Sequence, residues 1–424
     1  MATSRGTSRA RRRGWGFAAL AFVLVALAVY ADARLSIAFV SYKALPHDWP
    51  DHRFLQNFAR YDSGWYWHIA TRGYFYNGPG QQAAVAFFPA YPTLMRLGGH
   101  VLVDPLVAGI AINLLGGLGA VVLFWRWVEG FLGPRTARFA LLLLCLYPFS
   151  FYVMGAVYSD AVFLLAAVAA FTLVERDRPL LAGLVGILAT ADRPVGIALV
   201  MGLAVRQLEL SGVLPGSRRR AFVRPEGADG GDDDDVPPAL GLVPRRVRLA
   251  ALRPRDLTVV VSVLGLVLFC LYLWHTFHEP FAFLKVGSSI GWSRKVDLHT
   301  ISKIDVFGLW RDYGLNVITF WLTVQGLFSL VALAAIPAVV RRFGWGYGVY
   351  TLVAVGMAFV STPDFIGMGR YVVVAFPAFA AVGDILARRP AGRWRVVAPA
   401  LVLAASGLLL LWMASLYARW VFLA

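Results

Sequence analysis

The chain has 424 residues, of which 59% are hydrophobic and only 15% are charged, and its formal net charge is +16. Soluble domains carry about 25% charged residues, so the composition excludes an ordinary soluble globular protein. The excess positive charge comes from arginines between apolar runs, which is typical of cytoplasmic loops rather than of a nucleic-acid-binding surface. We therefore expect a protein embedded in a lipid bilayer, with no nucleic-acid partner.

Long apolar runs recur along the whole chain, and several reach the roughly 20 residues that a helix needs to cross a bilayer. Lipid offers the backbone no hydrogen bonds, so spanning segments must be helices or closed barrels, and the alternating pattern of a barrel is absent. The sequence predicts an all-α fold. This fold is a polytopic helical bundle of about nine full spans plus a half-membrane helical hairpin, with the N-terminus in the cytoplasm.

A basic tail, residues 1–14, precedes the first apolar run, which begins near Trp15. No small-residue cleavage site follows this run, so we expect a retained helix rather than a signal peptide. Residues 43–104 then form a long external segment that is rich in aromatic and charged residues. The next spans are predicted at 105–127, 138–155 and 159–174.

Residues 180–206 are apolar but are interrupted by a polar group at Asp192-Arg193-Pro194, and a strongly basic segment follows them. A single span would place that basic segment outside, against the positive-inside rule. Two half-length helices that turn near Asp192 keep it in the cytoplasm. A polar turn at that depth is tolerated only where it is buried in protein or lines a wet cavity. The sequence therefore predicts a hairpin that enters the membrane and returns.

A linker at 207–255 carries arginine clusters and the tract Asp232–Asp235, among glycine and proline. Without apolar periodicity such a segment is typical of a disordered cytoplasmic loop, and we expect no metal site in the aspartate tract. The linker divides the chain into an N-terminal transmembrane module, 15–206, and a C-terminal transmembrane module, 256–424. Spans of the second module are predicted at 257–277, 316–339, 345–361, 371–386 and 396–416.

The densest polar and aromatic cluster lies in the external segment, within residues 60–74. Aromatic residues such as Trp65 and Tyr66 have an ordinary role as anchors at the membrane interface. That role does not explain the ionisable side chains beside them, which are Arg60, Asp62, His68 and Arg72. A carboxylate in this setting can act as a general base on an acceptor hydroxyl, with its pKa tuned by nearby arginines. The alternative for Asp62 is a structural ion pair with Arg60.

Three further polar groups interrupt apolar runs, and the predicted topology places all of them on the outer side with Asp62. They are Tyr158-Ser159-Asp160, Asp192-Arg193-Pro194 and Gly369-Arg370-Tyr371. Ionisable groups within membrane segments are costly, so they mark candidate functional sites. A guanidinium forms bidentate hydrogen bonds to phosphoryl oxygens, which makes Arg193 and Arg370 candidates for binding a phosphate. The alternative for Arg193 is a pairing with Asp192 or Asp160 that holds helices together.

These residues resemble a known family. The stretch Arg60-Tyr61-Asp62-Ser63-Gly64-Trp65-Tyr66, continuing to Tyr74, and the later Ala86-Phe87-Phe88-Pro89-Ala90-Tyr91-Pro92 look like the signature of bacterial PIG-V-like mannosyltransferases. These enzymes are relatives of the one that adds the second mannose to glycosylphosphatidylinositol anchors. Later blocks match in order, at 147–160, 189–196 and 369–377. Two positions depart from the pattern, since members commonly have Trp at Tyr61 and Glu at Asp160.

The resemblance implies a fold of the GT-C type with an extracytoplasmic active site in the bacterial plasma membrane. It implies a polyprenyl-phosphate-linked mannose as donor, with no nucleotide sugar, essential metal or other cofactor. Asp62 would deprotonate an acceptor hydroxyl that attacks the anomeric carbon with inversion, while Arg193, Arg370 and Arg60 would be candidates to stabilise the leaving phosphate. The other candidates for substrate contacts are Asp160, Tyr158, Trp65, Tyr66, His68 and Tyr371.

Several alternatives stay open at this point. The acceptor is a glycan, a glycolipid or a protein, and the choice of mannose rests on the resemblance alone. A flippase or other transporter of a lipid-linked sugar would also need intramembrane charges, although a transporter places them near the midplane. A non-enzymatic membrane subunit has little need for such a cluster. The prediction of one outer site depends on the hairpin at 180–206, because a single span there would move the basic linker outside.

Overall fold

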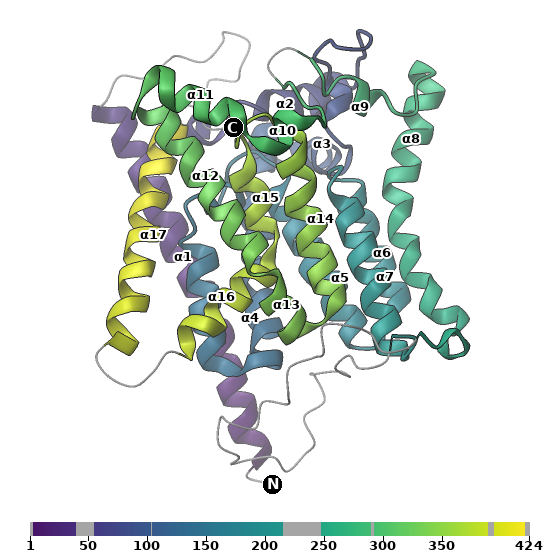
Figure 1. Cartoon of the computed structure of the whole chain (residues 1–424), viewed down its shortest axis with the longest axis vertical. Coiled ribbons are helices and arrows are strands. Elements are labelled where there is room, and N and C mark those ends of the chain that lie inside the picture. Colours follow the sequence, from purple (N-terminus) through teal and green to yellow (C-terminus); the bar gives the residue numbers. More distant parts are fainter. Residues whose placement is uncertain are drawn as a thin grey trace.

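The computed structural model describes residues 3–39, 55–102, 104–214, 247–289, 292–388 and 394–419, and every element in these ranges is a helix (Figure 1). The beginning of the predicted external segment, residues 43–54, lies outside them, as does the tract Asp232–Asp235. Short 3₁₀ helices connect the longer elements. They are η1 (Leu55–Phe58), η2 (Ala84–Ala86), η3 (Ser150–Val153) and η4 (Leu249–Ala251).

Five helices of the described ranges are long and apolar enough to cross a bilayer, so the chain is an integral membrane protein. A sixth results if α15 (Met368–Val374) and α16 (Phe376–Ala387), which meet at a bend of 74°, form one broken span. The five are α1 (Thr3–Phe39), α4 (Pro105–Cys145), the pair η5 (Pro254–Val263) and α8 (Leu264–Phe277), the pair α12 (Val317–Ala334) and α13 (Ile336–Phe343), and α17 (Trp394–Ala418).

This number is smaller than the predicted nine full spans, because several apolar runs form short or bent helices. The run at 105–127 lies in the first part of α4, before the break at Gly133 (φ +82°). The run at 138–155 lies after this break but is helical in α4 only as far as Cys145, so it is too short to cross the bilayer, and its end includes η3. The other short helices are α5 (Asp160–Glu175) with 16 residues and α14 (Trp345–Ser361) with 17 residues. The predicted tail at 1–14 is also mostly helical, since α1 begins at Thr3.

A helical hairpin occupies the segment 180–206, as the sequence predicts. It consists of α6 (Pro179–Thr190) and α7 (Gly196–Ser211), which run side by side (Figure 1) and turn between residues 191 and 195. The turn is tight: a Cβ atom on Gly196 would lie 2.6 Å from the Cα atom of Thr190. The depth of this hairpin in a membrane stays a prediction. Because α7 continues to Ser211 and η5 begins at Pro254, helices enter the predicted linker 207–255 from both ends.

The remaining helices form a layer across one end of the bundle (Figure 1). They are α2 (Ser63–Arg72), α3 (Ala90–Leu102), α9 (Ala282–Lys285), α10 (Leu298–Ser302) and α11 (Ile304–Tyr313). The opposite end holds α13, whose last turn carries Arg341 and Arg342. The segments that the sequence predicts to be external, 43–104 and 278–315, thus come together at one end in their described parts.

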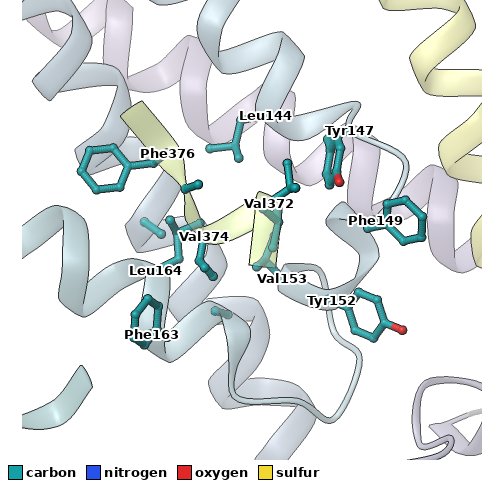
Figure 2. Packing of buried hydrophobic residues seen from close by; sticks show 14 of the residues in the cluster. Leu144, Tyr147, Phe149, Tyr152, Val153, Phe163, Leu164, Val372, Val374 and Phe376 are labelled. Atoms are coloured by element: carbon teal, nitrogen blue, oxygen red, sulfur yellow. The ribbon is translucent and has the colours of Figure 1, made fainter. Parts of the chain in front are cut away.

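One continuous apolar core includes side chains from α1 to α17, so both predicted modules contribute to it. Figure 2 shows its centre, where Val372 and Val374 of α15 lie among side chains of α5 and of the end of α4. The labelled neighbours from those elements include Phe163, Leu164 and Leu144. The short helix α15 is therefore held on several sides by apolar packing, which fixes the position of Arg370 at its beginning.

A buried ionic cluster joins the hairpin to α14 on the side away from the predicted site. Arg206 of α7 donates from Nε to Oε1 of Glu175 at 2.7 Å and from Nη1 to Oε2 of Glu209 at 3.2 Å. Glu209 also accepts the backbone N–H groups of Trp345 and Gly346, the first residues of α14, at 2.7 and 3.1 Å. A carboxylate at a helix N-terminus satisfies amides that lack a partner within the helix.

We predict that Arg206→Met destabilises the protein by about 3–5 kcal/mol, because it leaves two carboxylates buried without their cation. The side chains of Arg206, Glu175 and Glu209 are all fully buried. Thermal unfolding in detergent, with Arg341→Met as a control at an exposed arginine of the same end, measures the difference. Equal unfolding midpoints for the two variants would show that the cluster contributes nothing.

Candidate functional site

Four charged side chains from distant parts of the sequence meet in a continuous chain of ion pairs. Arg370 donates from Nη1 to Oδ2 of Asp62 at 2.7 Å and from Nε to Oδ2 of Asp160 at 3.3 Å. Arg193 donates from Nη1 to Oδ1 of the same Asp160. The order is therefore Asp62, Arg370, Asp160, Arg193. The sequence predicted that these four converge, and the structure brings them into direct contact; their chemical roles stay predictions.

Most of this ion-pair chain is buried, and one end of it, at Asp62, is partly exposed to solvent. Asp160 is completely buried, and Arg193 and Arg370 are 5% and 8% exposed. The side chain of Asp62 is 23% exposed. Asp62 is thus the member of the chain that a molecule arriving from outside can reach most easily.

The backbone around Asp62 is arranged so that its carboxylate points away from its own helix. Asp62 occupies the N-cap of α2 but makes no side-chain capping bond, although aspartate usually caps in this position. Tyr61 before it has a φ of +52°, in the left-handed region that non-glycine residues adopt at a cost of about 1–3 kcal/mol. The backbone N–H of Asp62 donates to Oη of Tyr158 at 3.1 Å, which stabilises this conformation.

Tyr158 is in turn positioned by Asn113, a buried residue in the first third of α4. Its Nδ2 donates to the carbonyl oxygens of Tyr152 and Tyr158, both at 2.9 Å, and its Oδ1 accepts the N–H of Gly155 at 2.7 Å. The guanidinium carbon of Arg370 lies 4.3 Å from the ring centroid of Tyr158, a cation–π contact. The sequence analysis missed Asn113. An amide within an apolar run was the signal that could have identified it.

Aromatic residues form one wall of the site. Tyr66 is buried, and its hydroxyl group shares a hydrogen bond of 3.2 Å with Oγ of Ser159, next to Asp160. Trp65 stacks on Phe87 with ring centroids 5.8 Å apart. It also packs edge-on against Trp292, at 5.7 Å, which comes from the second external segment. Tyr66 therefore belongs to the site itself, and Trp65 connects the site to the loop that precedes α10.

Three other predicted site residues are not members of the ion-pair chain. His68 packs against Phe75, and burial together with Arg72 lowers the pKa of its imidazole, so it is neutral near pH 7. Arg60 is buried, but the ion pair of Asp62 is formed with Arg370, not with Arg60. The ring of Tyr371 lies against Arg193, with 5.1 Å between the ring centroid and Cζ.

Arg193 forms an ion pair with Asp160. This pairing is one of the two that the sequence offered as the structural alternative for Arg193. The neighbouring Asp192 is 1% exposed and forms no ion pair with another described residue. Those residues also contain no group of three or more His, Cys, Asp or Glu side chains that could hold a metal ion.

An open groove of about 450 Å³ lies beside the site, between the layer of α2 and α3, the hairpin tip and α8. Its lining is mostly apolar and includes Ala191, which directly precedes Asp192. Leu268 and Tyr272 of α8 line it as well and are 59% and 43% exposed. The groove has the character needed for the apolar chain of a lipid. The other lining residues are Ile69, Gly73, Tyr74, Pro89, Pro92, Thr93, Arg96, Ile187, Gly265 and Phe269.

The fold is similar to that of an archaeal enzyme. The chain aligns with the crystal structure of the Archaeoglobus fulgidus oligosaccharyltransferase in complex with zinc and sulfate, at a TM-score of 0.50 and 15% sequence identity. The match covers 94% of this chain but 53% of the archaeal chain, so this chain spans about half of its length. At this identity the likeness shows the fold alone, a helical membrane bundle like that of the matched part of the archaeal chain.

A second structure from the same organism, the oligosaccharyltransferase AglB in complex with an inhibitory peptide and a dolichol-phosphate, aligns at a TM-score of 0.46. Its identity is 11%, and the match covers 95% of this chain and 56% of that one. No protein-family model matches the chain, and no curated protein does.

We predict unequal effects on stability for two neighbouring buried aspartates. Asp160→Asn removes the charge that pairs with both Arg193 and Arg370 and should destabilise the protein by about 3 kcal/mol or more. Asp192→Asn keeps the size of a buried side chain that belongs to no ion pair and should cause little loss. Thermal unfolding of both variants in detergent compares them directly. An Asp192 variant as unstable as the Asp160 variant would refute this account of the site.

Proposed function

We propose that the protein is an integral-membrane glycosyltransferase that takes a sugar from a polyprenyl-phosphate donor. The observation that carries the proposal is the partly exposed carboxylate of Asp62, held by Arg370 at the open end of a buried ion-pair chain. A chain that only held helices together would have no reason to present a carboxylate to the outside. The GT-C-like fold supports the same reaction class.

In this proposal Asp62 is the general base. One carboxylate oxygen accepts the proton of an acceptor hydroxyl, and the hydroxyl oxygen forms a bond to the anomeric carbon of the donor sugar. The bond from that carbon to the phosphate oxygen breaks, and the lipid phosphate leaves with the electron pair. Attack from the side opposite to the phosphate inverts the configuration. Arg370 supports this step by fixing Oδ2 of Asp62, which leaves Oδ1 directed to the acceptor.

The groove between α3, α6 and α8 supports a substrate that is dissolved in the bilayer. A polyprenyl chain needs an apolar path from lipid to the site, and the groove reaches Ala191, next to the hairpin tip. Mannose as the sugar, a glycan, glycolipid or protein as the acceptor, and an extracytoplasmic site in a bacterial plasma membrane follow from the resemblance and the charge pattern. They are part of the proposal.

A flippase for a lipid-linked sugar is the alternative. It would need charges that both sides of the membrane can reach in turn. Here Asp62 begins α2, Asp160 begins α5 and Arg193 lies at the hairpin tip. All three are bonded into one cluster beneath the layer of α2 and α3, at a single end of the bundle. This placement favours the transferase.

We predict that Asp62→Asn lowers kcat by roughly 100- to 10,000-fold, the usual contribution of a general base. The assay uses the full-length protein in detergent or nanodiscs, polyprenyl-phosphate mannose and a panel of glycan, glycolipid and peptide acceptors. Asp305→Asn is the matched control, because Asp305 lies in α11 at the same end with a side chain that is 49% exposed. It should retain wild-type activity. Full transfer by the Asp62 variant would exclude Asp62 as the base.

A further inference from the structure

The backbone that carries Asp62 is held by contacts separate from those of its carboxylate. Residues 59–62 connect η1 to α2 and belong to no helix. Ala59 and Arg60 are nevertheless buried, at 0% and 1% exposure. Buried peptide groups outside regular structure need hydrogen-bond partners from elsewhere in the protein. The position of Asp62 therefore depends on which groups supply these partners.

Two tyrosine hydroxyl groups supply them in the same manner. Oη of Tyr417, in α17, accepts the backbone N–H of Arg60 and donates to the carbonyl oxygen of Phe58, both at 3.3 Å. Oη of Tyr158 accepts the N–H of Asp62 at 3.1 Å and donates to the carbonyl oxygen of Arg60 at 3.3 Å. Each hydroxyl thus joins the carbonyl group of one residue to the N–H group two residues later. The two act in series on one short segment that ends at Asp62.

This arrangement requires a hydroxyl group, because only a group that both donates and accepts can make the two bonds. Tyr158 and Tyr417 are 0% and 1% exposed, so neither is open to a molecule that arrives from outside. The ring of Tyr417 packs on Phe151, with centroids 5.0 Å apart, and on Tyr61, at 5.7 Å. Apolar contacts therefore fix the ring, and the ring presents its hydroxyl to the backbone.

The residue with positive φ lies inside the segment that these hydroxyls hold. Tyr61 stands between Arg60, which contacts both tyrosines, and Asp62, which contacts Tyr158. A strained backbone conformation of this kind persists only where the surrounding structure determines it. Loss of one hydroxyl should let the segment relax, and the carboxylate of Asp62 should then move relative to Arg370.

We propose that Tyr417 is a positioning residue for Asp62 and acts in series with Tyr158. This inference rests on the proposed function, in which Asp62 is the general base, and adds the groups that fix its backbone. It brings α17 into the catalytic arrangement, although Tyr417 and Arg60 are 357 residues apart in the sequence. Tyr158, which the sequence offered as a candidate substrate contact, has the same positioning role. A displacement of about 1 Å at a catalytic group can lower the rate about 100-fold.

The test is Tyr417→Phe in the full-length protein, because phenylalanine keeps the ring contacts and removes only the hydroxyl. We expect kcat to fall roughly 10- to 100-fold with an unchanged KM for polyprenyl-phosphate mannose, since the buried hydroxyl does not contact the substrate. Tyr158→Phe should have the same kind of effect. The matched control is Ser406→Ala, also in α17, which removes a hydroxyl that donates to the carbonyl oxygen of Leu146 at 2.8 Å. It should retain wild-type activity.

Two further measurements distinguish positioning from a general loss of structure. In an Asp62→Asn background Tyr417→Phe should cause no further fall in kcat, because a residue that acts only through Asp62 has no effect once the base is gone. Hydrogen–deuterium exchange followed by mass spectrometry needs no activity. The peptide that contains residues 58–66 should exchange faster in Tyr417→Phe than in wild type, and at the wild-type rate in Ser406→Ala.

The outcomes separate this inference from the proposed function. If Asp62→Asn is inactive but Tyr417→Phe transfers sugar at the wild-type rate, the role of Tyr417 is refuted and the transferase remains. An equal fall in kcat with and without the Asp62 substitution would show a general structural effect and would also refute positioning. Unchanged exchange at 58–66 would show that the hydroxyl does not hold the segment. If wild type transfers no sugar, the proposed function fails, and this inference with it.

Discussion

The arrangement of the site depends on the carboxylate of Asp160, which two arginines share. It stands at the first residue of α5, Arg193 at the tip of the hairpin and Arg370 in the short helix α15. The hairpin follows α5 directly in the sequence, whereas Arg370 lies 210 residues beyond Asp160. A fully buried carboxylate is costly unless it is paired and hydrogen-bonded, so the three elements are most stable when they meet. The free side of Arg370 then holds Asp62, which connects the buried core to the outer layer.

Apolar and aromatic packing makes this ionic arrangement possible. The core places Val372 and Val374 of α15 against α5, which sets Arg370 beside Asp160 (Figure 2). Tyr158 lies under the guanidinium of Arg370 and is itself held by Asn113 through backbone carbonyls. Low polarity around the ion pairs strengthens them and excludes competing water. The outer layer adds the aromatic wall, and the bridge between Trp65 and Trp292 joins two segments that are more than two hundred residues apart.

The sequence was sufficient for the helical membrane fold, for the hairpin with its turn near Asp192 and for the gathering of Asp62, Asp160, Arg193 and Arg370 in one part of the molecule. These features follow from apolar run length, from loop charge and from the cost of intramembrane charge. The sequence overestimated the number of full spans, because hydropathy does not show that α5 and α14 form only 16 and 17 helical residues or that α15 and α16 meet at 74°. It also could not assign partners. Asp62 had Arg60 within two residues, yet its partner is 308 residues away, a choice that tertiary packing makes.

The most direct test of the central claim is a cryo-electron microscopy structure of the full-length protein with a polyprenyl-phosphate sugar bound. Our account predicts that the anomeric carbon lies within reach of the Asp62 carboxylate, at the exposed end of the ion-pair chain. The lipid chain should leave along the groove beside α8. Density for the phosphate at the opposite end of the bundle, near Arg341 and Arg342, would contradict both the site and the reaction proposed for it.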